Sequence, residues 1–97
     1  MRGKRIDANQ NEVVDKLRAI PDLSVAITSS LGQGFPDLVI GYGGNNFLIE
    51  LKDGSKTESK RKLTPAEEKF KEKWNGNYHV CNNYQEIIKV IYGCIWE

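Results

Sequence analysis

Two mainly apolar runs lie in the middle of the chain, over residues 37–42 and 47–52; Asp37 opens the first, and Glu50 and Lys52 lie at the end of the second. In a β-strand, successive side chains point to opposite faces with a period of two, so each run divides into two faces. The four residues between the segments, Gly43-Gly44-Asn45-Asn46, tolerate the positive φ angles of a tight reversal. The pattern therefore predicts a β-hairpin. Its apolar face is expected to carry Leu38, Ile40, Tyr42, Phe47, Ile49 and Leu51.

The opposite face of this hairpin collects three charged residues, Asp37, Glu50 and Lys52. A turn at the middle of the four-residue loop pairs Asp37 with Lys52 and Val39 with Glu50. Directly opposed positions lie ~5 Å apart and diagonal ones ~7–8 Å. We therefore expect Asp37 and Glu50 to reach a shared ion, with Lys52 beside them.

Such a cluster suits metal-assisted hydrolysis of a phosphodiester. Two hard oxygen ligands on a rigid sheet can hold Mg²⁺ or Mn²⁺ and leave positions open for water and a phosphate oxygen. Lys52 would then orient or activate the attacking water and offset the charge that grows on the phosphate. The alternative is a surface salt bridge between Lys52 and its neighbours, worth ~0–1 kcal/mol.

Three short motifs add to this spacing: Gly34-Phe35-Pro36-Asp37-Leu38, Glu50-Leu51-Lys52 and Leu63-Thr64-Pro65-Ala66-Glu67. With them the chain resembles the PD-(D/E)XK nuclease superfamily and, within it, the small VRR-NUC (virus-type replication-repair nuclease) domains. The resemblance extends over most of the chain, from about residue 9 to residue 91. It implies a metal-dependent, structure-selective DNA endonuclease that acts on branched DNA such as Holliday junctions or flaps, in a bacterial cell or a phage-infected host.

The resemblance also implies roles for individual residues. The counterparts of Asp37 and Glu50 bind the metal ion, and the backbone carbonyl at the position of Leu51 commonly adds a ligand. The lysine at Lys52 is catalytic. A glutamate on the first helix often completes the site, and Glu12 is the candidate here.

One residue departs from the family pattern. Many members carry glutamine on the helix after the lysine, whereas this chain has Glu67, a candidate catalytic residue that adds negative charge. Glu67 also stands three positions after Thr64, the spacing of a capping box, so it could cap the helix instead. Glu12 has the same ambiguity, because it stands three positions after Asn9.

The remaining periodicity predicts one α/β domain over residues 1–97. Helices are expected over about 9–20, 64–74 and 84–94, and strands over 24–28 and 78–81, in addition to the hairpin. The predicted order is α-β-β-β-α-β-α, with a mixed sheet flanked by helices. This is the order of a small restriction-endonuclease-like domain.

Basic residues gather in the loop that leaves the hairpin: Lys56, Lys60, Arg61 and Lys62. A second group, which includes Arg5, lies in a flexible basic arm expected over residues 1–8. Cations on either side of a metal site can track the phosphates of DNA. Both groups are candidate DNA contacts, and an ordinary solvated loop is the alternative. The formal net charge of +1 argues against indiscriminate coating of DNA.

Other features exclude several classes of protein. No apolar run approaches the ~18–20 residues of a membrane span, and the start of the chain is polar, so we expect a cytoplasmic protein. Cys81 and Cys94 lie in apolar stretches too far apart for a typical zinc site, and we expect both to be reduced core residues. His79 is the only histidine and is expected to be structural.

The last predicted helix has a second apolar stripe, formed by Ile88, Tyr92 and Ile95. One stripe suffices to pack against the sheet, so the second predicts a homodimer. A monomer whose chain end folds back over its own core is the alternative. A protein of a different class also remains open: a nucleic-acid-binding or assembly protein that keeps the nuclease fold without turnover.

Overall fold

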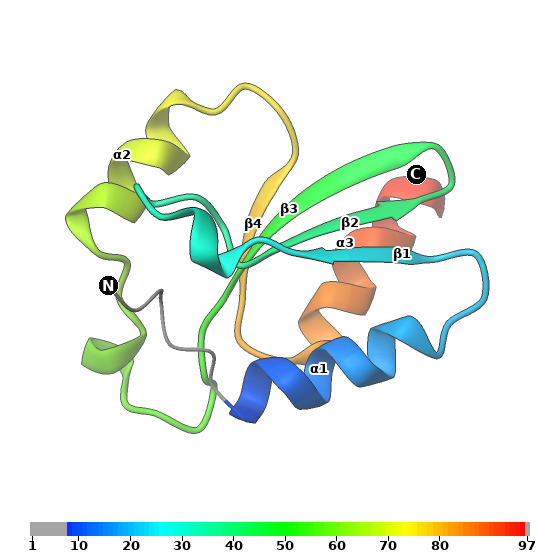
Figure 1. Ribbon diagram of the computed structural model, residues 1–97, viewed down its shortest axis with the longest axis horizontal. Helices are drawn as coiled ribbons and strands as arrows, with labels where there is room; N and C mark the ends of the chain where they lie inside the picture. Colours follow the sequence, from blue (N-terminus) through cyan, green and yellow to red (C-terminus); the bar gives the residue numbers. More distant parts are fainter. Residues whose placement is uncertain (1–7, 97) are drawn as a thin grey trace.

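The computed structural model describes residues 8–96 and confirms the predicted element order (Figure 1). The elements are α1 (Ala8–Arg18), β1 (Ser24–Ile27), β2 (Leu38–Tyr42), β3 (Asn45–Leu51), α2 (Pro65–Lys73), β4 (Tyr78–Cys81) and α3 (Tyr84–Trp96). Two short 3₁₀ turns that the sequence did not predict, Ser29–Leu31 and Glu58–Arg61, lie in the loops before β2 and after β3. The expected basic arm falls almost wholly outside the described residues.

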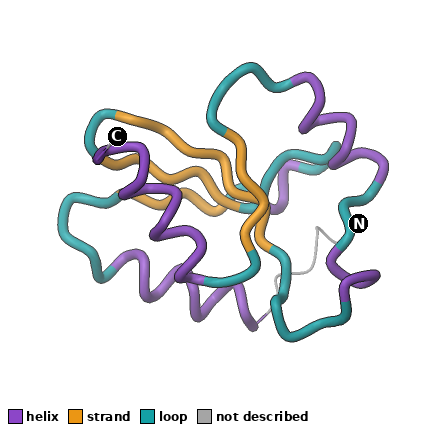
Figure 2. The backbone as a smooth tube through the Cα atoms, turned by 180° about the vertical axis from the view of Figure 1, so that it is seen from behind, coloured by secondary structure: helices purple, strands orange, loops and turns teal. Residues whose placement is uncertain are grey.

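The four strands form one mixed sheet in the order β1-β2-β3-β4. The first three strands are antiparallel, and β4 pairs parallel with β3. Figure 2 shows α1 and α3 side by side against one face of this sheet. In Figure 1, α2 lies apart from them, toward the end of the sheet away from the β2–β3 turn.

The β2–β3 turn consists of two glycines. Tyr42 pairs with Asn45, which leaves only Gly43 and Gly44 between the strands. Their φ angles are 60° and 82°. Positive φ at both central residues is the requirement of a type I′ turn, whose twist matches that of the flanking strands.

This turn sets a register two residues away from the predicted one. The predicted pairs of Asp37 with Lys52 and Val39 with Glu50 are wrong: Val39 pairs with Leu48, and continuing the ladder by two steps places Asp37 across from Glu50. Because side chains alternate with a period of two, a slip of two residues leaves every side chain on its predicted face. The charged residues therefore still share one face, and the two acids face each other directly.

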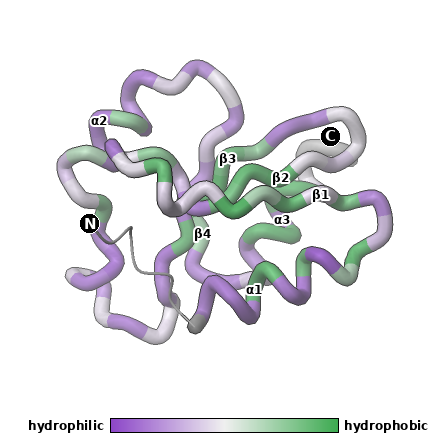
Figure 3. Tube along the Cα trace, viewed as in Figure 1, coloured by the Kyte–Doolittle hydropathy of each residue, from purple (hydrophilic) through white to green (hydrophobic). Residues whose placement is uncertain are grey.

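The core lies between the sheet and the helix pair α1–α3. Figure 3 shows the hydrophobic positions concentrated on the strands, whereas the loop from β3 to α2 is largely hydrophilic. The buried side chains include Val13, Val14 and Leu17 of α1, Leu38, Ile40, Phe47 and Ile49 of the hairpin, Cys81 of β4, and Ile87 and Ile91 of α3. The predicted apolar face of the hairpin is confirmed.

Several smaller expectations are also decided by the structure. Cys81 is a free, buried thiol, and burial raises its pKa to about 12; the side chain of Cys94 lies outside the described part.

Helix α1 begins at Ala8, so Asn9 lies within its first turn rather than before it. Between residues 8 and 96, no helix is long and apolar enough to cross a bilayer.

Aromatic rings join α2 to the sheet. The ring of Phe70 lies edge-on to that of Phe35, with centroids 5.2 Å apart, and also contacts the ring of Tyr78 on β4 at 5.8 Å. The loop before β2 comes closer still, at Gly34. A Cβ atom at Gly34 would stand 2.2 Å from the carbonyl oxygen of Ala66, in the first turn of α2. Only glycine permits this approach, which seats α2 against the chain just before Asp37.

We expect Gly34→Ala to destabilise the fold more than Gly32→Ala does. Both glycines have positive φ, 80° and 77°, and Gly32 also has a ψ of −173°, a combination that is essentially restricted to glycine, so each alanine carries a conformational cost of about 1–3 kcal/mol. Gly32 has open space around its Cβ position, whereas Gly34 faces the backbone of α2. Urea unfolding of the two variants compares this conformational cost alone, in Gly32→Ala, with the same kind of cost plus a packing term, in Gly34→Ala, which is expected to add about 1–3 kcal/mol. Equal losses in the two variants would contradict the close approach of α2.

Candidate metal and phosphodiester site

A hollow of about 240 Å³ opens where β2 and β3 meet the start of α1 and the first turn of α2. It is lined by Asn9, Gln10, Asp37, Glu50, Leu51, Lys52, Asp53, Lys56, Lys60 and Glu67. Five of the residues that the sequence singled out as catalytic or metal-binding therefore lie together. They come from three segments that are separate in the sequence, and they become neighbours only when the chain folds.

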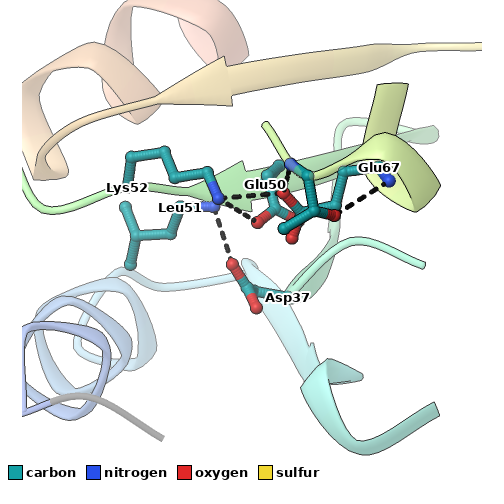
Figure 4. Close-up of polar contacts among 6 residues, drawn as sticks. Asp37, Glu50, Leu51, Lys52 and Glu67 are labelled. Atoms are coloured by element: carbon teal, nitrogen blue, oxygen red, sulfur yellow. Dashed lines mark hydrogen bonds and ion pairs between the residues drawn. The ribbon is translucent and has the colours of Figure 1, made fainter. Parts of the chain in front are cut away.

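Asp37 is held by three hydrogen bonds around it. The Thr28 N–H donates to its backbone oxygen at 2.8 Å, and the Thr28 hydroxyl donates to the oxygen of Pro36 at 2.8 Å. The Leu51 N–H donates to Asp37 Oδ2 at 2.9 Å (Figure 4). The side chain is only 4% exposed. These contacts fix the carboxylate at the end of the sheet.

Lys52 lies between two buried carboxylates. Its Nζ is 3.0 Å from Glu67 Oε1 and 3.4 Å from Glu50 Oε2 (Figure 4). Glu50 is 1% exposed and Glu67 is 4% exposed. The two carboxylates are buried and Lys52 is partly buried, so this is not the exposed surface salt bridge that was the alternative.

Glu67 caps α2, and the same side chain also pairs with Lys52. Its Oε1 accepts the Thr64 N–H at 2.9 Å, and the Glu67 N–H donates to Thr64 Oγ1 at 3.2 Å, which completes the capping box of α2. The same Oε1 atom accepts the ammonium of Lys52. One carboxylate therefore begins the helix and closes the site.

Burial and pairing act in opposite directions on these charges. Burial favours the neutral form of Lys52, but the hydrogen bond to Glu67 and the charge of Glu50 outweigh it and raise the pKa of Lys52. Burial likewise favours neutral Glu67, but the Thr64 N–H and the Lys52 ammonium outweigh it and lower the pKa of Glu67. Both groups are therefore charged at neutral pH.

The donor set suits a hard divalent cation. Three carboxylates and one ammonium leave a formal charge of −2 in the buried cluster, which one divalent ion would neutralise. Within residues 8–96, no group of three or more histidine, cysteine, aspartate and glutamate side chains is arranged to hold a metal ion. Mg²⁺ is commonly bound by one or two carboxylates together with water and substrate phosphate, so the facing pair Asp37 and Glu50 fits that mode.

The remaining predicted residues divide into two groups. Lys56 and Lys60 line the hollow, whereas Lys62 is exposed and Arg61 donates its Nε–H to the Lys56 oxygen at 3.1 Å. Arg5 lies outside the described residues.

Glu12 is not brought to the hollow. Its side chain is 74% exposed, and its Oε1 lies 3.9 Å from Lys16 Nζ, one turn along α1.

The same helix contributes Gln10, which the sequence analysis missed. Gln10 is 5% exposed, lines the hollow and donates from Nε2 to Ser29 Oγ at 3.0 Å. A signal was present, because Gln10 continues the buried stripe of Val13, Val14 and Leu17 at helical spacing and is its one polar member.

Tyr78 was also missed. Its hydroxyl is buried with no hydrogen-bond partner among the described residues, and burial, followed by the charge of Glu50, raises its pKa. His79 lies on the adjacent position of β4, paired with Ile49, and burial lowers its pKa. It is not among the residues that line the hollow, in agreement with a structural role.

Comparisons with protein-family models, with curated proteins and with solved structures find no match for this chain.

Glu67→Gln is expected to lower stability at neutral pH by about 1–2 kcal/mol, because it removes a buried charged hydrogen bond while keeping an acceptor for Thr64. The folded pKa of Glu67 is lowered, so its contribution is present above the unfolded value near 4.5 and is lost as pH falls through the folded value. Denaturant unfolding between about pH 3 and pH 7 should show the two proteins converge in acid.

Glu68→Gln provides the matched control. Glu68 is exposed in the same first turn and has the same relation to the helix dipole. Equal losses in both variants, or a loss from Glu67→Gln that persists unchanged in acid, would contradict the buried pair.

Proposed function

We propose that this protein is a Mg²⁺- or Mn²⁺-dependent endodeoxyribonuclease that hydrolyses phosphodiester bonds of branched DNA. One observation carries the proposal: two buried acids, Asp37 and Glu50, line the same hollow at the end of the sheet together with lysines, and the ammonium of Lys52 lies 3.4 Å from Glu50. Water adds to phosphorus and the bond to one sugar oxygen breaks, which leaves a phosphate monoester and a hydroxyl.

Asp37 and Glu50 would hold the ion, and the backbone carbonyl of Leu51 is the third donor that the family resemblance suggests. When bound, the ion lowers the pKa of a water molecule and polarises the phosphate. The Leu51 N–H keeps Asp37 oriented, since it donates to Oδ2. Gln10, which lines the hollow and is itself buried, limits the space available to solvent.

Lys52 acts as a cation in this mechanism. Its raised pKa keeps it protonated at neutral pH, so it is poorly suited to abstract a proton from water. A fixed ammonium beside the reacting phosphate offsets the charge that grows there, which is the larger catalytic effect. Glu67 holds this ammonium in place, 3.0 Å away.

The motifs and the fold support the same mechanism. The Pro-Asp motif, the Glu-Leu-Lys motif and the Leu-Thr-Pro-Ala-Glu helix start resemble VRR-NUC domains, and each contributes to the lining of the hollow, the helix start through Glu67. The resemblance is the basis for proposing Holliday junctions or flaps as substrates and a bacterial or phage-infected cell as the setting. The elements described over residues 8–96 are mostly taken up by the sheet and the helices that cover it, which favours structure over sequence as the determinant.

The homodimer stays a prediction. Ile88 and Tyr92 pack in part against the core of the monomer, and the Tyr92 ring lies edge-on to Tyr42 with centroids 5.5 Å apart. The monomer thus already covers part of the stripe from which the dimer was inferred. The side chain of Ile95 lies outside the described part.

Nicking of a labelled four-way junction with Mn²⁺, together with calorimetric Mn²⁺ titration, tests the proposal. Asp37→Asn should weaken Mn²⁺ binding and lower the cleavage rate. Lys52→Met should keep or strengthen Mn²⁺ binding, because the cluster becomes more negative, but lower the rate by about a hundredfold or more. The two variants thus separate metal binding from catalysis.

Asp15→Asn and Lys89→Met, which change exposed residues of α1 and α3, are the controls. Circular dichroism verifies that each variant is folded. A wild-type protein that binds junctions but never cuts them would favour the non-catalytic nucleic-acid-binding or assembly protein. Unchanged Mn²⁺ affinity in Asp37→Asn would remove Asp37 as a ligand.

Replacing Lys56 and Lys60 by glutamine should weaken binding to every DNA tested. Both lysines line the hollow, and the slope of log K against log salt should flatten by up to about 0.9 for each phosphate that the protein no longer neutralises. Lys89→Gln is the control. An unchanged slope would mean that the loop is merely solvated.

A further inference from the structure

A second hollow, which runs along α2, is lined by aromatic and basic residues. This α2 groove has a volume of about 590 Å³ and is formed by Gln33, Pro65, Ala66, Lys69, Phe70, Lys73 and Trp74. An adjoining hollow of about 340 Å³ continues it past Phe35 and Leu31. Among the described residues, only Ile27, Leu31 and Trp74 are large hydrophobic side chains that are exposed. Two of the three border this surface.

The aromatic rings of the groove form a supported stack. Trp74 and Phe70 lie nearly parallel, with an interplanar angle of 15° and centroids 5.2 Å apart. Phe70 is in turn braced edge-on by Phe35. A Cβ atom at Gly76 would stand 2.9 Å from the indole nitrogen, so the chain after α2 closes over one edge of Trp74. The indole is 42% exposed and nevertheless held by its neighbours.

Charge along the groove is of one sign. Lys69 and Lys73 are both exposed and lie one turn apart on the groove side of α2. Neither Glu68 nor Glu72 is among the lining residues, although Glu72 is three positions from Lys69 and so lies next to it on the helix surface. A planar apolar stack whose charged lining residues are both lysines matches a ligand with flat bases and negative phosphates.

The groove is connected to the candidate site by α2 itself. Glu67 lines the hollow at one end of the helix and Trp74 ends the helix at the other. Seven residues at ~1.5 Å each separate them by about 10 Å along the axis. That distance corresponds to about three nucleotides at the ~3.4 Å rise of one strand.

We propose that the α2 groove binds unpaired bases of a DNA strand by stacking on Trp74, with Lys69 and Lys73 contacting its phosphates. This inference rests on the proposed nuclease function and extends it. A flap supplies an unpaired strand next to the branch, whereas linear duplex supplies none. The groove therefore gives a physical reason for preferring flaps over duplex.

Binding of a labelled oligothymidylate of about 12 nucleotides, without divalent metal, tests the groove independently of turnover. Trp74→Ala should weaken this binding by about tenfold, the expected loss of one stacked base, while binding to blunt duplex changes little. Trp74→Tyr should retain most of the affinity. Quenching of tryptophan fluorescence by the oligonucleotide should be lost in Trp74→Tyr, because the reporting indole is gone.

Lysine variants separate phosphate binding from general charge. Lys69→Gln with Lys73→Gln should flatten the salt dependence of oligothymidylate binding. Lys71→Gln, on the same helix but outside the groove lining, should not. Equal affinity of wild type and Trp74→Ala for the oligonucleotide would overturn the inference. A dimer that becomes monomeric in Trp74→Ala, with DNA binding unchanged, would also overturn it and assign the groove to a second copy of the chain.

The groove and the nuclease proposal can fail separately. Wild type and Trp74→Ala could cleave junctions at equal rates and bind oligothymidylate with equal affinity. That result would contradict the proposed role of the groove and would be consistent with the proposed nuclease activity. Conversely, the protein could cut no DNA and still bind oligothymidylate in a way that depends on Trp74. That result would contradict the proposed nuclease activity and would support the groove as a single-strand binding surface.

Discussion

The charge of Lys52 is the interaction on which the rest of the structure depends. Its ammonium compensates Glu50 on the sheet and Glu67 on α2, at 3.4 Å and 3.0 Å. Removing a charged group from water costs several kcal/mol unless a partner compensates it. The cluster therefore requires α2 to lie against the end of β3. The packing of the helix and the geometry of the site are consequences of one constraint.

Two backbone features make this arrangement possible. The Gly43-Gly44 turn sets the hairpin register that places Asp37 across from Glu50. Gly34 lets the loop before β2 touch the backbone of Ala66, so the first turn of α2 comes within reach of Lys52. Neither feature contributes a functional side chain, yet each determines where one lies. The glycine before the Pro-Asp motif thus has a steric explanation.

The sequence predicted the fold well because alternation and helix caps are local signals. It identified the buried face of the hairpin, and the Thr64–Glu67 capping box gave the start of α2. It missed the register, because a Gly-Gly-Asn-Asn loop admits turns two residues apart that bury the same face. It named Glu12 because the family resemblance implies a glutamate on the first helix, and it did not consider Gln10, although Gln10 lies on the buried stripe and Glu12 does not.

The free-energy cost of burying the charged cluster helps to decide between an enzyme and a binding protein. Apolar residues of similar volume in place of a buried ion pair are often neutral or stabilising by about 1–4 kcal/mol. A fold that served only to bind DNA through Lys56, Lys60 or the α2 groove would be at least as stable without the buried acids. Burying the acids and Lys52 costs free energy of folding, whereas the same groups can bind a divalent ion and a phosphate. Their joint presence in one hollow therefore favours chemistry over binding alone.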